Sequence, residues 1–235
     1  MKLLVEGKAK KVFLTKERNK LLQYFKDDTT AFNNKKKKVF KNKGILNNYI
    51  SSIIFEYLNK NKIKTHFIKR ISDREQIIKK LKIIPLEVVV RNYAAGSIAK
   101  RFNLKHGIKF KTPIIEFYYK SDELNDPFMN ADHIMYLKLA SITEINKIKR
   151  ISIKINNLLS KLFLEANIIL VDFKLEYGWY KNDILLADEI SPDSCRLWDK
   201  KLKSSLDKDL FRQNKGGLIE AYENIFNKLN RKRNV

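Results

Sequence analysis

Two apolar runs that carry acidic residues toward each other constrain this chain more than any other feature. The first run, residues 168–177, places polar side chains at Asp172, Lys174 and Glu176 and apolar side chains between them. This period of two predicts a strand with one polar and one apolar face. The turn-forming sequence Lys-Asn-Asp and a second apolar run, residues 184–187, follow it. The segment therefore predicts an antiparallel hairpin.

The predicted hairpin brings carboxylates together. A turn centred on Asn182 places Glu176 opposite Asp188, whereas a turn centred one half-step later places Glu176 opposite Glu189. Either register opposes two like charges, which destabilises a strand pair unless a cation lies between them. Magnesium is typically held by one or two carboxylates together with substrate phosphate oxygens. The hairpin therefore indicates a magnesium site, and the alternative is a polar strand edge that faces solvent.

Composition indicates a globular protein. The chain has 235 residues, of which 44% are hydrophobic and 11% aromatic, enough for the core of one large domain or two small ones. No segment approaches the ~20 apolar residues of a membrane span, and the N-terminus meets acidic and basic residues too early for a signal peptide. We therefore expect a cytoplasmic protein with no membrane partner.

Cysteine and histidine usage excludes two further classes of site. Cys195 is the single cysteine of the sequence, so an internal disulfide is impossible. The histidines His66, His106 and His133 are scattered without metal-ligand spacing. Zinc and redox sites are not expected.

The net charge of +23 raises the question of a nucleic-acid partner. The basic residues are spread along the chain, and Lys35 to Lys38 is the only run of four lysines. Lysine is enriched together with asparagine and isoleucine, which is typical of a composition bias. Clustered basic residues with interleaved stacking aromatics are missing from the sequence. We therefore expect small anionic substrates and no nucleic acid.

The pattern of elements predicts two parts. Residues 1–84 begin with short strand-like runs that predict a meander, followed by a helix over residues 44–58. A second helix is predicted over residues 72–80, with Ser72 as N-cap and Glu75 completing a capping box. A strand begins directly after Pro85, which therefore marks the predicted boundary between a lobe of residues 1–84 and a lobe of residues 85–235.

The second part carries the remaining expected elements. A helix begins near Ser97, a loop surrounds Asp126, and helices cover residues 132–140, 143–166 and 218–229. No repeat or low-complexity linker separates the two parts, so we expect them to pack closely. A cleft between them is the default position of a binding site.

Basic residues mark two candidate anion sites. Lys8 and Lys10 follow Gly7 two residues apart, a spacing that projects both amines to one side of a strand or hairpin. Arg91 ends an apolar strand, and an Ala-Ala-Gly turn brings Ser97 to a helix N-terminus, where backbone amides favour an anion. The alternative is an ordinary strand-turn-helix with Ser97 as a plain N-cap.

Other polar residues complete the set that phosphoryl transfer requires, which is lysines for phosphates, carboxylates for magnesium and arginines for an anionic acceptor. These residues are Glu87, Lys120, Asp126, Arg196 and Arg212.

Six motifs occur in an order and spacing that resemble the SAICAR synthetase family of purine biosynthesis: GKAK, PLEVVVRNYAAGS, DELNDP, ILVDFKLEYG, LADEISPDSCRLWD and DKDLFRQNKGGLIEAYE. The resemblance covers nearly the whole chain. It implies a two-lobed α+β fold related to protein kinases and ATP-grasp enzymes, with antiparallel sheets, helices and ATP between the lobes. It also implies ligation of carboxyaminoimidazole ribonucleotide (CAIR) to L-aspartate with consumption of ATP, and a homodimer.

The resemblance assigns roles to individual residues. The nucleotide-binding set that it implies is Gly7, Lys8, Ala9, Lys10, Glu87, Lys120 and Lys174, with magnesium on Glu176 and Asp188, which favours the Glu176–Asp188 register. The substrate-binding set is Arg91, Ser97, Asp126, Asp172, Arg196, Asp209 and Arg212. The catalytic set is Lys10, Lys174, Asp172 and Arg212. A kinase-like phosphotransferase that acts on a small anion is the alternative enzyme.

Overall fold

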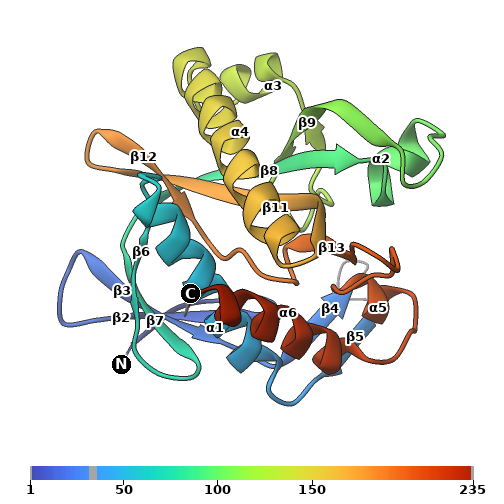
Figure 1. Ribbon diagram of the computed structural model, residues 1–235. Coiled ribbons are helices and arrows are strands. Elements are labelled where there is room, and N and C mark those ends of the chain that lie inside the picture. Colours follow the sequence, from blue (N-terminus) through green and yellow to red (C-terminus); the bar gives the residue numbers. More distant parts are fainter. Residues whose placement is uncertain (1, 32–35, 234–235) are drawn as a thin grey trace.

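The computed structural model describes residues 2–31 and 36–233 and has an α+β fold built on two antiparallel sheets (Figure 1). The predicted fold class is therefore confirmed. Lys35, the first residue of the four-lysine run, lies outside the described residues. None of the helices within these ranges is long and apolar enough to cross a membrane.

The first sheet has the strand order β1-β2-β3-β7-β6. Its strands are β1 (Leu3–Glu6), β2 (Lys10–Leu14), β3 (Lys20–Phe25), β6 (Phe67–Arg70) and β7 (Glu75–Lys79). The first three pair in sequence order, so the predicted meander is confirmed. Helix α1 (Lys43–Lys60) packs against β3 and β6 and confirms the helix predicted over residues 44–58. A separate ribbon consists of β4 (Asp28–Ala31) and β5 (Lys36–Val39).

The helix predicted over residues 72–80 was wrong, because this segment forms the turn and strand of the β6–β7 hairpin. Burial alternates along β7, with Gln76 and Ile78 facing inward, which is the period of a strand. The Ser72 hydroxyl donates to the Glu75 carboxylate at 3.0 Å, a bond between side chains, whereas a capping box joins each side chain to a backbone amide. Here the same Ser-x-x-Glu signature stabilises a hairpin turn instead of a helix N-terminus.

The second sheet has the order β10-β9-β8-β11-β12, and β13 also pairs with β11. Its strands are β8 (Lys82–Tyr93), β9 (Lys109–Tyr119), β10 (Phe128–Met129), β11 (Ile168–Tyr180), β12 (Asp183–Ala187) and β13 (Cys195–Asp199). Strand β11 is central, because β8 pairs along one edge while β12 and β13 pair with successive halves of the other. The predicted β11–β12 hairpin is thereby confirmed. Pro85 lies within β8, and division of the chain at residue 84 stays a prediction.

Helix α4 (Ile142–Glu165) covers the apolar face of β11 (Figure 1). Ser141 and Glu144 form a capping box at its start, and apolar residues at positions such as Ile148 and Ile155 are fully buried. The Tyr177 hydroxyl of β11 lies 2.7 Å from a serine hydroxyl of α4. The apolar face of β11 therefore packs into the main core, and its polar face points away from the helix.

Four further helices complete the fold of the described residues. They are α2 (Gly96–Arg101), α3 (Ala131–Tyr136), α5 (Asp209–Arg212) and α6 (Leu218–Arg233). The last of these returns from the second sheet to lie beside α1, so both ends of the chain contribute to one region (Figure 1). This packing places the loops after β12 and β13 between the two sheets.

Backbone hydrogen bonds join the two sheets at His66. The His66 amide donates to the Leu186 carbonyl at 2.8 Å, and the Leu186 amide donates to the Lys64 carbonyl at 3.1 Å. The imidazole is buried beside the Phe55 ring, 5.3 Å between centroids, and its Nε2 has no hydrogen-bond partner among the described residues. Burial lowers the pKa of His66 to about 4.

This burial predicts a specific dependence of stability on pH. The folded protein keeps His66 neutral, whereas the unfolded chain binds a proton below its ordinary pKa of 6.5, so stability falls as the pH falls from 6.5 to about 4. The slope that His66 contributes is about 1.4 kcal/mol per pH unit. His66→Phe keeps the ring contact with Phe55 and removes the titratable imidazole. Urea denaturation of this variant should therefore show a smaller loss of stability as the pH falls. Equal slopes in the two proteins would contradict the prediction.

Candidate active site

The register of the β11–β12 hairpin differs from both sequence-based alternatives. Glu176 pairs with Ala187 across the ladder, because Lys181 adopts a positive φ of 54° and the turn contains only two residues. The acid directly opposite Glu176 is Glu87, on β8. The predicted pairing of Glu176 with Asp188 was therefore wrong as a strand register, although the two side chains still meet.

Asp188 reaches Glu176 from just beyond the end of β12. It adopts a positive φ of 61°, which turns the chain out of the strand. Burial and then the neighbouring Asp188 carboxylate raise the pKa of Glu176 to about 7. The Glu176 and Asp188 carboxylates therefore lie close together. The sequence predicted this proximity, but from a register that the hairpin does not have.

Two lysines neutralise this acid pair. Lys10, at the start of β2, pairs with Asp188 and also lies 3.1 Å from Glu189, and Lys120 pairs with Glu176. Burial alone would lower the pKa of Lys10, but the acids beside it raise that pKa above its ordinary value. One oxygen of the buried Glu189 has no partner among the described residues. The first and second sheets therefore meet at a cluster of opposite charges, which we call the carboxylate–lysine cluster: Lys10, Lys120, Glu176, Asp188 and Glu189.

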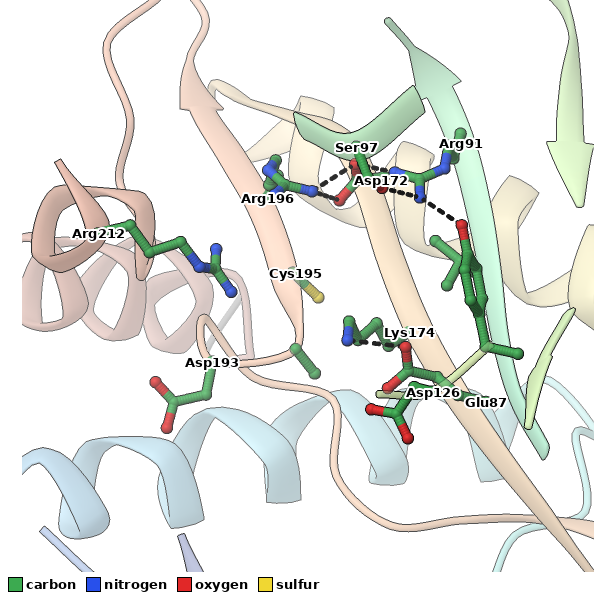
Figure 2. Close-up of a pocket in the computed structure, with 13 residues that line it drawn as sticks. Glu87, Arg91, Ser97, Asp126, Asp172, Lys174, Asp193, Cys195, Arg196 and Arg212 are labelled. Atoms are coloured by element: carbon green, nitrogen blue, oxygen red, sulfur yellow. Dashed lines mark hydrogen bonds and ion pairs between the residues drawn. The ribbon is translucent and has the colours of Figure 1, made fainter. Parts of the chain in front are cut away.

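Figure 2 shows a cavity of the protein, whose volume is about 250 Å³. It adjoins the cluster at Glu87, which lines the cavity and pairs with Glu176 across β8 and β11. Most of its polar lining comes from β8, β11, β13 and the segment that leads into β13. The polar and charged residues of the lining are Glu87, Arg91, Ser97, Tyr118, Asp126, Asp172, Lys174, Asp193, Ser194, Cys195, Arg196 and Arg212.

One wall of the cavity is a row of paired charges that crosses three strands. Asp172 on β11 lies opposite Arg91 on β8 and opposite Arg196 on β13. Its carboxylate accepts from Arg91 at 3.1 Å and from Arg196 at 2.9 Å (Figure 2). Arg196 also donates to Asp209 at 2.9 Å, and Asp209 in turn pairs with Arg212. Arginine forks held in this way suit recognition of a phosphate.

Ser97 does not cap helix α2, because Ala95 occupies the N-cap position. Its hydroxyl instead accepts a hydrogen bond of 2.9 Å from Arg91. Gly96 adopts a positive φ of 59°, and the Arg196 guanidinium packs where its Cβ would be. The plain-cap alternative for Ser97 is therefore excluded, and the Ala-Ala-Gly turn is needed to bring two arginines together.

The opposite side of the cavity carries acidic groups and one lysine. Lys174 donates to Glu87 at 2.7 Å, and Asp126 lies next to Glu87 (Figure 2). The Asp126 carboxylate also accepts from the Ser121 amide at 3.0 Å, which closes its loop. Lys174 is half exposed, so its ammonium group is available to a ligand.

The structure divides the sequence-predicted site residues into two adjacent groups. The cavity group is Glu87, Arg91, Ser97, Asp126, Asp172, Lys174, Arg196 and Arg212. Lys10, Lys120, Glu176 and Asp188 form the carboxylate–lysine cluster, and Gly7, Lys8 and Ala9 precede it in the turn before β2. Lys8 lies apart and pairs with the exposed Asp122 at 2.7 Å. Asp209 does not line the cavity and acts on Arg196 and Arg212 from behind.

Sequence reasoning missed Asp193 in the loop before β13. Its carboxylate accepts from the buried Lys43 and from Asn47 of α1, and from Tyr222 of α6 at 2.7 Å. Burial alone would raise the pKa of Asp193, but Lys43 holds that pKa below its ordinary value. The signal in the sequence was the Ser-Pro-Asp-Ser turn, whose role depends on two helices far away in the chain.

Among the residues that the structure describes, no group of three or more acidic, histidine or cysteine side chains is arranged to hold a metal ion. A metal at this site would therefore depend on ligands from a bound substrate as well as from the protein. This is the usual situation for magnesium at phosphate-transfer sites.

Comparison with known proteins identifies the family. A model of the SAICAR synthetase family matches residues 3–229. Phosphoribosylaminoimidazole-succinocarboxamide synthase of a Thermoanaerobacter species is 55% identical over 227 residues, which cover 97% of each chain. The enzyme of that name from the Wolbachia of Brugia malayi is 56% identical over 231 residues, which cover 97% of this chain and 96% of the other.

Solved structures agree with the sequence comparisons. The crystal structure of phosphoribosylaminoimidazole-succinocarboxamide synthase from Ehrlichia chaffeensis has a TM-score of 0.96 at 52% identity, covering 97% of this chain and 98% of the other. A SAICAR synthetase in complex with ADP has a TM-score of 0.94 at 51% identity, covering 97% of each chain. Together with the paired arginines and the carboxylate–lysine cluster, these likenesses show that the chain belongs to the SAICAR synthetase family.

Proposed function

We propose that this protein joins CAIR to L-aspartate with cleavage of ATP to ADP and phosphate, a step of purine biosynthesis. The observation that carries the proposal is the contact between two charged sites, a cavity walled by paired arginines and an acid pair bridged by lysines. The first suits a phosphorylated acceptor and the second suits a nucleoside triphosphate. A relative of the same fold was solved with ADP.

We assign the nucleotide to the carboxylate–lysine cluster. The turn of Gly7, Lys8 and Ala9 leads into Lys10, so a phosphate chain could lie beneath this hairpin within reach of Lys10 and Lys120. Both ammonium groups pair with carboxylates, and phosphate oxygens can replace those carboxylates. We assign Glu87 to the adenine side of the nucleotide, as the resemblance implies.

We assign magnesium to Glu176 and Asp188. Hard carboxylate oxygens suit this ion, and burial together with the neighbouring Asp188 raises the pKa of Glu176, so the ionised acid pair needs positive charge beside it. Two lysines supply positive charge there. When bound, magnesium would neutralise charge on the transferring phosphoryl group.

We assign the cavity to the ribonucleotide. Arg91, Ser97 and Arg196 would bind its 5′-phosphate, and Asp172 keeps both guanidinium groups in place. Lys174 lies between this wall and the carboxylate–lysine cluster, in position to contact the reacting phosphoryl group. Asp126 and Arg212 would complete the substrate contacts at the cavity's margins, with Asp209 behind Arg212.

The proposed reaction has two steps. A carboxylate oxygen of CAIR attacks the γ-phosphorus of ATP, so that a new oxygen–phosphorus bond forms, the bond to ADP breaks and an acyl phosphate results. The amine of L-aspartate then attacks the acyl carbon, loses a proton and expels phosphate. Lys10 and Lys174 stabilise negative charge that develops on the phosphoryl oxygens. No nucleophile from the protein is required.

The decisive experiment is an assay of phosphate release with purified ribonucleotide, ATP and magnesium. Release should depend on L-aspartate, and isotopically labelled oxygen in the CAIR carboxylate should appear in the phosphate. A simple kinase would consume ATP without the amino acid. Phosphate release that ignores L-aspartate would therefore contradict the proposal.

The Gly96→Ala variant tests the phosphate site. The new Cβ would overlap the Arg196 guanidinium, so we expect the KM for CAIR to rise by at least about tenfold. The left-handed backbone adds a stability loss of about 1–2 kcal/mol. Gly217→Ala is the matched control, since Gly217 also has a positive φ, of 78°, but nothing lies within 4 Å of its Cβ position. A similar change in the KM for CAIR in both variants would indicate that backbone strain is the cause. It would contradict the proposed overlap of the new Cβ with the Arg196 guanidinium.

We also propose that the protein acts in the cytoplasm and forms a homodimer. Both statements follow from the resemblance to the family. Size-exclusion chromatography with light scattering tests the second.

A further inference from the structure

A buried acid behind the cavity holds the arginine that faces the ligand. Glu116 of β9 is 5% exposed and does not line the cavity. One of its carboxylate oxygens accepts from Arg91 Nε at 2.6 Å and from the Tyr118 hydroxyl at 2.8 Å. The other oxygen pairs with Arg101 of α2.

Four groups hold the Arg91 guanidinium. Nε donates to Glu116, one terminal nitrogen donates to Asp172, and the other donates to Ser97 at 2.9 Å and to the Tyr118 hydroxyl at 3.4 Å. A guanidinium fork is planar, so contacts on all three nitrogens determine its orientation completely. Without Glu116, Arg91 would keep Asp172 as its remaining acidic partner and could pair with it through both terminal nitrogens. Such pairing would turn the fork away from Ser97 and from the cavity.

We propose that Glu116 is a positioning residue that orients Arg91 for the 5′-phosphate of the ribonucleotide. The proposal rests on the proposed function, which assigns that phosphate to Arg91 and Ser97. Glu116 touches no ligand itself and acts through the Nε contact. Its second partner, Arg101, anchors the carboxylate from the side of α2, so that strand β9 and helix α2 together set the angle of the fork.

The test is Glu116→Gln, which keeps the shape of the side chain and removes its charge. A neutral amide cannot accept from two guanidinium groups as a carboxylate does, so we expect the KM for CAIR to rise about 10- to 100-fold. The KM for ATP should stay within about twofold of wild type, because the nucleotide lies at the carboxylate–lysine cluster. Glu116→Asp restores the charge and should lie closer to wild type than the glutamine variant.

A double-mutant cycle with Arg91→Met shows whether Glu116 acts through Arg91. In that background no fork remains to be oriented, so adding Glu116→Gln should change the KM for CAIR by less than about threefold. If Glu116→Gln raised the KM for CAIR by the same factor in the wild-type and Arg91→Met backgrounds, that result would overturn the proposal. So would an unchanged KM in Glu116→Gln, an equal rise for CAIR and ATP, or an aspartate variant no better than the glutamine variant.

Asp183→Asn is the matched control. Asp183 also holds two cations, Lys64 and Lys147, but at the distant turn of the β11–β12 hairpin. Asp183→Asn should leave the KM for CAIR unchanged. A rise of this KM in Asp183→Asn equal to the rise in Glu116→Gln would also overturn the proposal. Circular dichroism and thermal unfolding establish that each variant is folded.

A binding measurement separates this proposal from the proposed function. Calorimetry with ribose 5-phosphate reports on the phosphate site without any turnover. Weaker binding by Glu116→Gln than by wild type supports the positioning role, even if wild type releases no phosphate in the presence of L-aspartate. Equal binding by the two proteins overturns the role, even if wild type is an active ligase.

Discussion

Replacing either Glu176 or Asp188 with alanine is expected to reduce turnover by at least about a thousandfold while leaving the protein folded. Each variant removes one of two carboxylates assigned to magnesium, and the charge of the transferring phosphoryl group then lacks its principal neutralising partner. The loss should appear in kcat measured as L-aspartate-dependent phosphate release. Raising the magnesium concentration should recover part of it.

The stability of these variants is informative as well. Burial and Asp188 raise the pKa of Glu176 to about 7, so the ionised form of its carboxyl group is costly in the folded protein. Above neutral pH, Glu176→Gln should therefore raise the free energy of unfolding. Asp183→Asn, at the far end of the same hairpin, controls for a general effect of lost acidic groups and should keep normal turnover. Activity retained in either alanine variant would contradict the metal assignment.

Replacing Asp172 with asparagine should lower the stability of the protein, the opposite of the effect of Glu176→Gln, and should raise the KM for CAIR. Asp172 is 3% exposed and lies between the buried Arg91 and the partly buried Arg196, so its loss leaves both cations without their shared partner. Removal of one member of a buried charge network costs about 3–5 kcal/mol. The arginine forks also lose their orientation toward the phosphate, and the KM for CAIR should rise at least about a hundredfold.

Chemical denaturation and steady-state kinetics check both parts of this prediction. The contrast with Glu176 is the critical point, because both acids lie on the polar face of β11. Asp172 lies between two arginines and stabilises the fold, whereas Glu176 is buried beside a second acid, and this cost exceeds the gain from its pairing with Lys120. A loss of stability in Glu176→Gln as large as that in Asp172→Asn would contradict the account of the site.

Local patterns predicted much of the fold correctly. The alternation along β11 was visible in the sequence, and so was the apolar periodicity of α1 and α4. Such patterns report which side of an element is buried, and burial is the main constraint on each element. The pattern failed over residues 72–80, because a serine and a glutamate three residues apart fit a hairpin turn as well as a helix start.

The residues of the site were predicted better than their arrangement. Glu176 and Asp188 were paired by a register that the two-residue turn at Lys181 does not permit. Their proximity depends instead on the positive φ of Asp188, which no periodic pattern encodes. Glu116 and Asp193 were missed, since each is an isolated acid in sequence and gains its role from partners on distant elements.

The sequence by itself determined the family, the two-faced strand β11 and the chemical inventory of carboxylates, lysines and arginines, because these depend on residue type and local spacing. Tertiary structure alone decided which charges are neighbours. Arg91, Asp172 and Arg196 come from three strands and align only when the sheet forms, and Lys10 reaches Asp188 only when the first sheet packs against the second. Electrostatic interactions depend on distances of a few ångströms between atoms far apart in the chain, and only the folded structure sets those distances.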